Sequence, residues 1–217
     1  MQAKGRTRGA TGLRKKRILA QARNLFWQKG YSSVSMRDLA RAYGCQPANL
    51  YHYFETKESI LFAVLLEEME QIIQPISHLE QDEQGDPVDQ LRFIIASHLK
   101  VTLSYRRSAK TLFDVALDHL SPANRKVIIS MRDTYDRIIR KIIRRGQETG
   151  LFVPYNEKVV GFMISSMITR SRIWFHPKKE VTVDELADFI FRFTMGGIQT
   201  SQGVEKSGGT EEWKAFG

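Results

Sequence analysis

Residues 35–57 read SMRDLARAYGCQPANLYHYFETK, and this stretch predicts two short helices separated by a tight turn. Ser35 followed three residues later by Asp38 is a capping box, which satisfies backbone N–H groups at the start of a helix. Gly44 permits the turn, because glycine tolerates a left-handed backbone. Pro47 suits the first turn of a second helix, where its missing N–H costs nothing. The stretch therefore predicts a helix-turn-helix.

The second helix of such a motif enters the major groove of DNA and presents its N-terminal side chains to the base edges. An amide such as Gln46 or Asn49 bonds adenine in a bidentate way, and Ala48 suits a thymine methyl group. Hydroxyl groups and cations usually contact phosphates. We expect groove contacts from Gln46, Ala48, Asn49 and Tyr51, and phosphate contacts from Ser35, Arg37, Tyr51, His52 and Lys57.

Positive charge is concentrated at the N-terminal end of the chain. Residues 1–60 contain twelve Lys or Arg and three Asp or Glu, a net charge of +9, whereas residues 61–217 contain twenty-one of each. Cations that neutralise phosphates supply most of the non-specific affinity for DNA. The alternative is a basic N-terminus that is merely solvated, but a charge run alone would not come with a helix-turn-helix pattern. Residues 1–12, with Lys4, Arg6 and Arg8, are expected to form a disordered basic arm, either on DNA or free.

The motif resembles the TetR family of transcriptional regulators. The resemblance covers about the first 65 residues and rests on the spacing of Ser35, Leu39, Ala40, Gly44, Leu50, Tyr51, Tyr53, Phe54, Lys57, Glu58 and Leu61. It implies a ligand-responsive, sequence-specific regulator, most often a repressor that its effector releases from the operator. The chain departs from the family pattern at Tyr43, Cys45, Gln46, Ala48 and Asn49. The operator therefore does not follow by analogy.

The rest of the chain reads as helical almost throughout, without sustained period-two alternation. Residues 13–29 predict a first long helix that braces the motif, with Tyr53 and Phe54 in its core. We expect an all-α protein with an N-terminal three-helix helix-turn-helix domain and a helical ligand-binding and dimerisation domain. The expected bounds are 13–57 for the first domain, 58–200 for the second, and 201–217 for a flexible tail.

Cap signals predict where the later helices begin: Thr56, Asp86 with Pro87, Ser121 with Pro122, and a capping box of Thr182 and Glu185. The helix after Thr56 continues to Ile73 and links the two domains. Cations are dense in residues 132–145, which indicates either a second nucleic-acid site or a solvated face that also carries Asp133 and Asp136.

Two later segments, residues 159–175 and 183–194, carry apolar side chains that indicate both a core and a partner contact. A homodimer places two recognition helices in successive grooves of a pseudo-palindromic operator, about 34–36 Å apart. The family resemblance implies that these two segments pair with their mates as a four-helix bundle. Double-stranded DNA, a small-molecule effector and a second copy of the chain are therefore the expected partners.

Arg170 and Trp174 are four residues apart and therefore lie on one helix face. An Arg side chain beside a Trp side chain can bind an anionic group that is attached to a flat ring. Residues 120–193 also resemble the ligand domain of the acyl-CoA-responsive branch of the TetR family, in LSPANRKVIISMRDTYDRIIRKIIRRGQETGLF and WFHPKKEVTVDELADFI. This resemblance implies an acyl-CoA thioester as effector, with the CoA part near Arg170 and Trp174. The alternatives are an intersubunit ion pair for Arg170 with Trp174 in the core, and a different hydrophobic effector, such as a drug or lipid.

Enzymes and non-specific architectural DNA binders are the competing classes. The best catalytic set is Asp114, Asp118, His119 and His98, but it lacks any motif spacing, and we expect no catalytic residue, metal site or cofactor. No apolar run is long enough to cross a bilayer, and the start of the chain lacks the apolar segment of a secretory signal. With a single cysteine, Cys45, a cytoplasmic location without membrane contact is expected.

Overall fold

The computed structural model describes residues 3–104, 116–176 and 181–201, with side chains from Gly12 onward. The helices are α1 (Ala3–Lys29), α2 (Met36–Tyr43), α3 (Pro47–Tyr51), α4 (Lys57–Ile73), η1 (Gln74–Glu80), α5 (Pro87–Ser104), η2 (Leu117–His119), α7 (Pro122–Glu148), α8 (Glu157–Trp174) and α9 (Val183–Ile198). In these ranges the chain forms no strand, only an isolated bridge between Phe152 and Gln199. The all-α prediction is confirmed.

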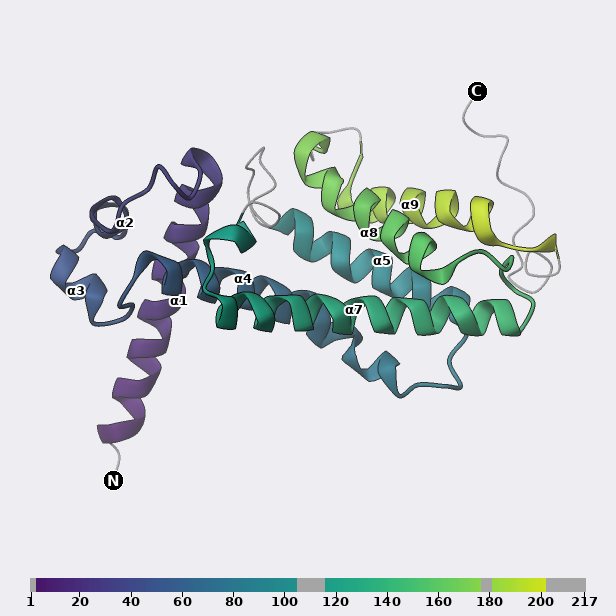
Figure 1. Cartoon of the computed structure of the whole chain (residues 1–217), viewed down its shortest axis with the longest axis horizontal. Helices are drawn as coiled ribbons and strands as arrows, with labels where there is room; N and C mark the ends of the chain where they lie inside the picture. Colours follow the sequence, from purple (N-terminus) through teal and green to yellow (C-terminus); the bar gives the residue numbers. More distant parts are fainter. Residues whose placement is uncertain (1–2, 105–115, 177–180, 202–217) are drawn as a thin grey trace. The chain divides into compact units, whose positions relative to one another are not determined.

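The chain divides into two compact units, residues 1–70 with 106–131 and residues 71–105 with 132–217. In the first unit, α2 packs on both α1 and α3 (Figure 1). Its core includes Ile18, Ala22, Phe26, Leu39 and Leu50, each at most 2% exposed. Arg23 on α1 donates from Nη2 to Glu67 Oε2 on α4 at 2.5 Å, which ties α4 to the same unit.

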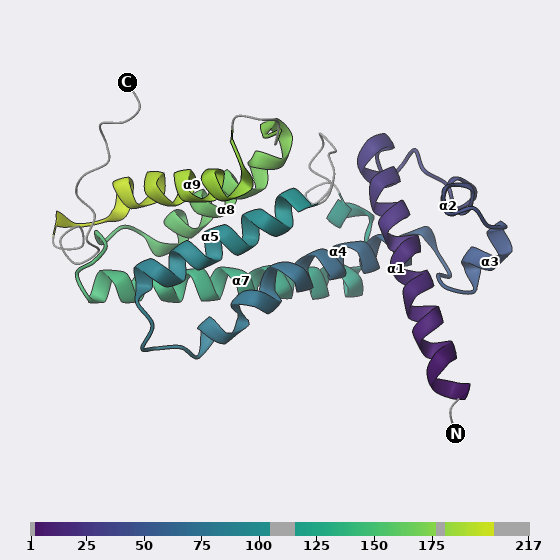
Figure 2. The same ribbon diagram turned by 180° about the vertical axis from the view of Figure 1, so that it is seen from behind.

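The second unit is a bundle in which α5 packs against α8 and α9, as both views show (Figure 1 and Figure 2). Its core draws on α5, α7, α8 and α9 and includes Leu91, Ile95, Ile138, Ile142 and Ile168, all fully buried. Helices α7 and α8 approach closely at Gly161. A Cβ added there would lie only 3.2 Å from Ile139 Cγ2. The second unit thus has a core of its own, whereas residues 58–70 and 116–131, predicted as part of the effector domain, group with the first unit.

Most predicted helix ends are confirmed, because they are encoded by local caps. Ser59 N–H donates to Thr56 Oγ1 at the start of α4, and Val88 N–H donates to Asp86 Oδ1 at the start of α5. The capping box of Thr182 and Glu185 precedes α9. Gly30 and Gly150 adopt positive φ angles of 80° and 72° just after α1 and α7 end.

The main differences from the sequence prediction lie at the start of the chain and after α4. Helix α1 begins at Ala3 rather than Leu13, so residues 3–12, predicted as a disordered arm, continue the helix. Residues 3–29 contain no proline to interrupt the backbone hydrogen bonds, so the helix predicted for residues 13–29 extends through them although Gly5, Gly9 and Gly12 are poor helix formers. After α4 the chain forms the 3-10 helix η1 over Gln74–Glu80, an element that was not predicted from the sequence. The tail predicted at 201–217 lies outside the described residues, apart from Ser201.

The cations of residues 132–145 mostly bind acceptors within the second unit. Arg137 Nε donates to Glu80 Oε1 at 2.8 Å, and Arg144 Nη2 donates to Glu157 Oε1 at 2.8 Å. Arg145 donates to the backbone carbonyl groups of Asp82, Glu83 and Gly85. These bonds favour the structural reading of this face over a second nucleic-acid site, because their donors already have partners.

Candidate functional site

Local bonds fix the two short helices of the first unit. The Ser35 side chain accepts the Asp38 N–H at 3.2 Å, and Asp38 Oδ2 accepts the Ser35 N–H at 3.0 Å, which completes the capping box. These bonds lower the pKa of Asp38, mainly through the Ser35 side chain. Gly44 has a φ of 79°, and Cys45 N–H donates to Ala40 O at 2.9 Å, so α2 ends in a left-handed cap. The next helix then starts at Pro47.

Helix α3 turns one side inward and the other to solvent. Leu50 is fully buried and Phe54, which follows the helix, is 5% exposed, so both anchor α3 to the core of the unit. The predicted groove candidates all have exposed side chains: Gln46, Ala48, Asn49 and Tyr51, the last 50% exposed. Among the predicted phosphate candidates, Ser35, Arg37 and His52 are also exposed. The exposed side chains of these candidates thus offer amide, methyl, hydroxyl and guanidinium groups to solvent.

Lys57, a predicted phosphate candidate, is tied to the unit itself. Its Nζ donates to Tyr31 O at 3.0 Å and lies 4.1 Å from the centroid of the Tyr31 ring. Burial lowers the pKa of Lys57. The phosphate role of Lys57 stays a prediction, and the structure adds a structural role that fixes the start of α4.

Three cations on α1 lie close to aromatic side chains of the helix-turn-helix. They were not identified from the sequence as candidates for DNA contact. Lys15 Nζ lies 5.1 Å from the Phe54 ring centroid, and Arg17 lies 5.9 Å from the Tyr43 ring centroid. Arg14 is hydrogen-bonded to Tyr53, which raises the pKa of its guanidinium. The signal was the run RKKR at 14–17, because such a run puts cations on several sides of a helix.

The segment that leads into α7 packs on the same unit. Glu58 Oε1 accepts hydrogen bonds from the Ser121 N–H and from Asn124 Nδ2, both at 2.8 Å, and these bonds lower the pKa of Glu58. The ring of His119 stacks against Tyr31, with centroids 4.7 Å apart. These contacts give structural roles to two members of the catalytic set considered above. Asp118 Oδ1 lies 3.6 Å from Arg125 Nη1, and His119 packs on Tyr31. Asp114 lies outside the described residues.

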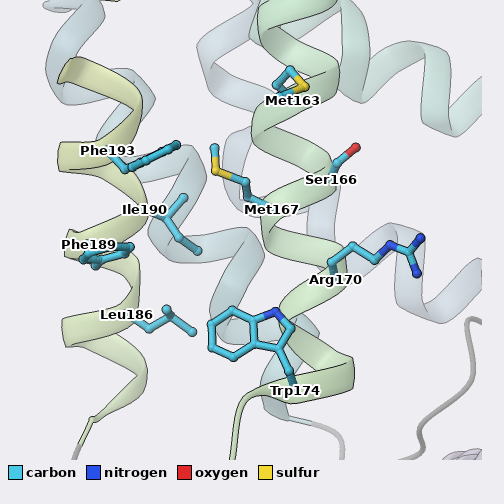
Figure 3. Close-up of a pocket in the computed structure, with 9 residues that line it drawn as sticks. All are labelled: Met163, Ser166, Met167, Arg170, Trp174, Leu186, Phe189, Ile190 and Phe193. Carbon is cyan, nitrogen blue, oxygen red and sulfur yellow. The ribbon is translucent and has the colours of Figure 1, made fainter. Parts of the chain in front are cut away.

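In the second unit, one face of α8 and α9 is apolar and exposed. Phe162, Phe189 and Phe193 are 69%, 65% and 63% exposed. The rings of Phe189 and Phe193 are stacked, 6.3 Å apart. A groove of about 420 Å³ lies between the two helices (Figure 3) and is lined by Met163, Ser166, Met167, Arg170, Trp174, Leu186, Phe189, Ile190 and Phe193.

Arg170 and Trp174, the predicted effector residues, both line this groove. Trp174 is 59% exposed, so it does not fill the core. Figure 3 shows the Trp174 indole over the groove, whereas the Arg170 guanidinium points away from the indole. The two residues share a helix face, as predicted, but do not form an arginine–indole pair.

The core of the second unit contains a buried polar pair that includes His98, which was considered from the sequence only as a member of a catalytic set. His98 Nδ1 on α5 and Tyr135 Oη on α7 are 2.8 Å apart, and the rings meet edge to face. Burial, with a smaller contribution from the charge of Arg172, lowers the pKa of His98 to about 3. Burial also raises the pKa of Tyr135. Both side chains are therefore neutral at neutral pH.

Metal ligands and membrane spans are the other features that could indicate a function. Across residues 3–104, 116–176 and 181–201, no group of three or more His, Cys, Asp or Glu side chains is arranged to hold a metal ion. None of the helices in those ranges is long and apolar enough to span a membrane.

Known proteins similar to this chain share its two-part organisation. Residues 18–64 match the family model described as bacterial regulatory proteins, tetR family, and residues 84–198 match the tetracyclin repressor-like C-terminal domain. The solved TetR family transcriptional regulator PfmR from Thermus thermophilus is 32% identical, with a TM-score of 0.69 over 81% of this chain and 97% of that one.

Two further similar proteins match different shares of this chain. AibR, solved in complex with isovaleryl coenzyme A and operator DNA, shares the fold at 24% identity and a TM-score of 0.71, over 83% of this chain and 97% of AibR. The transcriptional repressor DhaR of Mycobacterium sp. (strain GP1) is 27% identical over 133 residues, which cover 61% of this chain and 67% of DhaR. Because one family model covers over half of the chain and a second covers its helix-turn-helix, the chain belongs to the tetR family of bacterial regulatory proteins.

Proposed function

We propose that this protein is a sequence-specific repressor that binds a pseudo-palindromic operator as a homodimer. The observation that carries the proposal is the exposed edge of α3, where Gln46, Ala48 and Asn49 face solvent while Leu50 anchors the helix. The cations of α1 and the exposed Arg37 belong to the same unit and supply affinity for phosphates. Repression is the function that the name of DhaR states for that relative.

Base-edge and phosphate contacts predict different mutant behaviour. After selection of a preferred duplex from random oligonucleotides, Gln46→Ala or Asn49→Ala should reduce the preference over scrambled DNA about tenfold. Arg37→Ala should weaken binding to both duplexes alike. It should also reduce the slope of log affinity against log salt concentration by about one, as expected for the loss of one phosphate contact. Fluorescence anisotropy at several salt concentrations measures both effects. If the wild-type protein selects no inverted repeat, a non-specific architectural role replaces this proposal.

The proposed effector is an acyl-CoA thioester. Its support is the resemblance of residues 120–193 to acyl-CoA-responsive regulators and the isovaleryl coenzyme A bound by AibR, which shares the fold. Such a ligand releases DNA if it prefers a conformation in which the two recognition helices no longer match successive grooves, because only differential affinity shifts an equilibrium. Helix α4 begins beside the helix-turn-helix, so we infer that it transmits the change.

The effector proposal predicts that acyl-CoA raises the melting temperature, since a ligand that binds only the native state stabilises it. It should also release the operator in the anisotropy assay, whereas free CoA should do so weakly. If Arg170 contacts the CoA phosphates, Arg170→Ala should weaken the binding of acyl-CoA more than the binding of the matching fatty acid. A change in dimer dissociation without a change in acyl-CoA affinity would instead assign Arg170 to the partner contact. A panel of drugs and lipids tests the alternative of another hydrophobic effector.

A further inference from the structure

Thr102 on α5 is an unusual threonine in this chain. Buried threonines and serines in helices commonly donate to the carbonyl group one turn earlier. The buried Thr194 donates from Oγ1 to Ile190 O at 2.8 Å, and the buried Ser171 donates from Oγ to Ile168 O at 2.6 Å. Thr102 is 1% exposed, and within the described part of the chain its Oγ1 has no hydrogen-bond partner. A buried hydroxyl without a partner is destabilising, so the Thr102 hydroxyl is free to donate a hydrogen bond to a bound ligand.

Two polar residues, His98 and Arg172, are next to Thr102 inside the second unit, and further polar groups are linked to His98. His98 lies one turn before Thr102 on α5 and hence on the same face. Its partner Tyr135 belongs to the hydrophobic core, and the side chain of Ser165 on α8 is also hydrogen-bonded to Tyr135. Arg172 Nε on α8 donates to Thr102 O at 3.3 Å. Helices α5, α7 and α8 thus bring neutral donors and one cation together in an otherwise apolar interior.

This combination has a definite chemical preference. The Thr102 hydroxyl can donate to an oxygen acceptor, and the nearby guanidinium of Arg172 favours partial or full negative charge on that acceptor. His98 is neutral, so it adds no competing charge, and Tyr135 is likewise uncharged. Isoleucine and leucine side chains of the same core suit a hydrocarbon tail. The matching ligand group is the carbonyl oxygen of an acyl chain, either in a thioester or in a free carboxylate.

We propose that Thr102, with His98, Tyr135 and Arg172, forms the subsite that holds the carbonyl oxygen of the effector's acyl group. This inference rests on the proposed function, because it presumes an acyl effector. It goes beyond that proposal by placing the acyl carbonyl group in the core, away from the open groove at Arg170 and Trp174. The apolar tail then lies among the core side chains.

The test compares Thr102→Val with two controls. Thr102→Val removes the hydroxyl at nearly constant volume and should leave the ligand-free melting temperature unchanged or raise it, while it weakens octanoyl-CoA or isovaleryl-CoA about tenfold. Thr102→Ser keeps the hydroxyl and should retain most of the affinity. Thr194→Val removes a buried hydroxyl that already has a partner, so it should lower stability without changing ligand affinity.

Isothermal titration calorimetry with octanoyl-CoA, isovaleryl-CoA, octanoate and free CoA supplies the affinities. Tighter binding of octanoate than of octanoyl-CoA would identify a carboxylate as the natural source of the carbonyl oxygen. If an acyl compound binds wild-type protein and Thr102→Val equally well, the subsite is wrong while the proposed effector class stands. If no acyl compound binds wild-type protein, both the effector class and the subsite are wrong.

Discussion

Replacing Gly146 by alanine should destabilise the second unit by about 3 kcal/mol, within the range expected for overpacking a dense core. A Cβ built at Gly146 would lie 2.1 Å from Cδ2 and 2.3 Å from Cε2 of the Phe152 ring. Phe152 is 2% exposed, so its ring cannot swing into solvent without loss of its burial. Urea unfolding at fixed protein concentration measures the effect.

The sign of this effect separates packing from backbone entropy. Alanine normally stabilises a helix relative to glycine by about 0.5–1 kcal/mol. Gly196→Ala on α9 is the matched control, because a Cβ there would meet nothing within 4 Å, and it should be neutral or stabilising. A Gly146→Ala protein as stable as wild type would show that Phe152 does not pack against α7 as described.

The contact between Gly146 and Phe152 also shows where sequence reasoning stops. Caps are local, so the starts of α2, α4, α5 and α9 followed from residue type and spacing within four positions. Gly146 carries no such signal. Its neighbour becomes apparent only after the chain turns at Gly150 and Phe152 returns to the helix through a backbone bond to Gly146 O at 2.9 Å.

In the candidate sites, too, local features could be predicted from the sequence and contacts between distant residues could not. Exposure of Gln46, Ala48 and Asn49 around a buried Leu50 followed from helical periodicity. The tie between Lys57 and Tyr31 spans 26 residues, and the pair of His98 and Tyr135 spans 37, so neither has a local pattern. For Arg170 and Trp174, helical spacing gave the shared face correctly. It did not give the direction of the Arg170 side chain, which depends on its rotamer.

Aspartate at both Phe189 and Phe193 should convert the protein to a monomer and reduce operator affinity by at least about 100-fold. These two rings are 65% and 63% exposed on the apolar face of α8 and α9, where we place the partner subunit. Two carboxylates buried in that contact would each lose hydration without an opposite charge. A monomer binds one half-site only, and loses the effective concentration through which the second recognition helix adds about 10²–10⁴ to affinity.

Sedimentation at micromolar concentration and anisotropy with the selected operator measure the two effects, and circular dichroism checks that the fold is kept. Phe93→Asp is the matched control, because Phe93 is a 44% exposed phenylalanine of the same unit on α5 and lies outside the α8–α9 face. It should remain dimeric and bind the operator as wild type does. Binding to a single half-site should be equal in both variants, since α3 is untouched. A double variant that stays dimeric would place the partner contact elsewhere, and a monomer with full operator affinity would remove the need for two recognition helices.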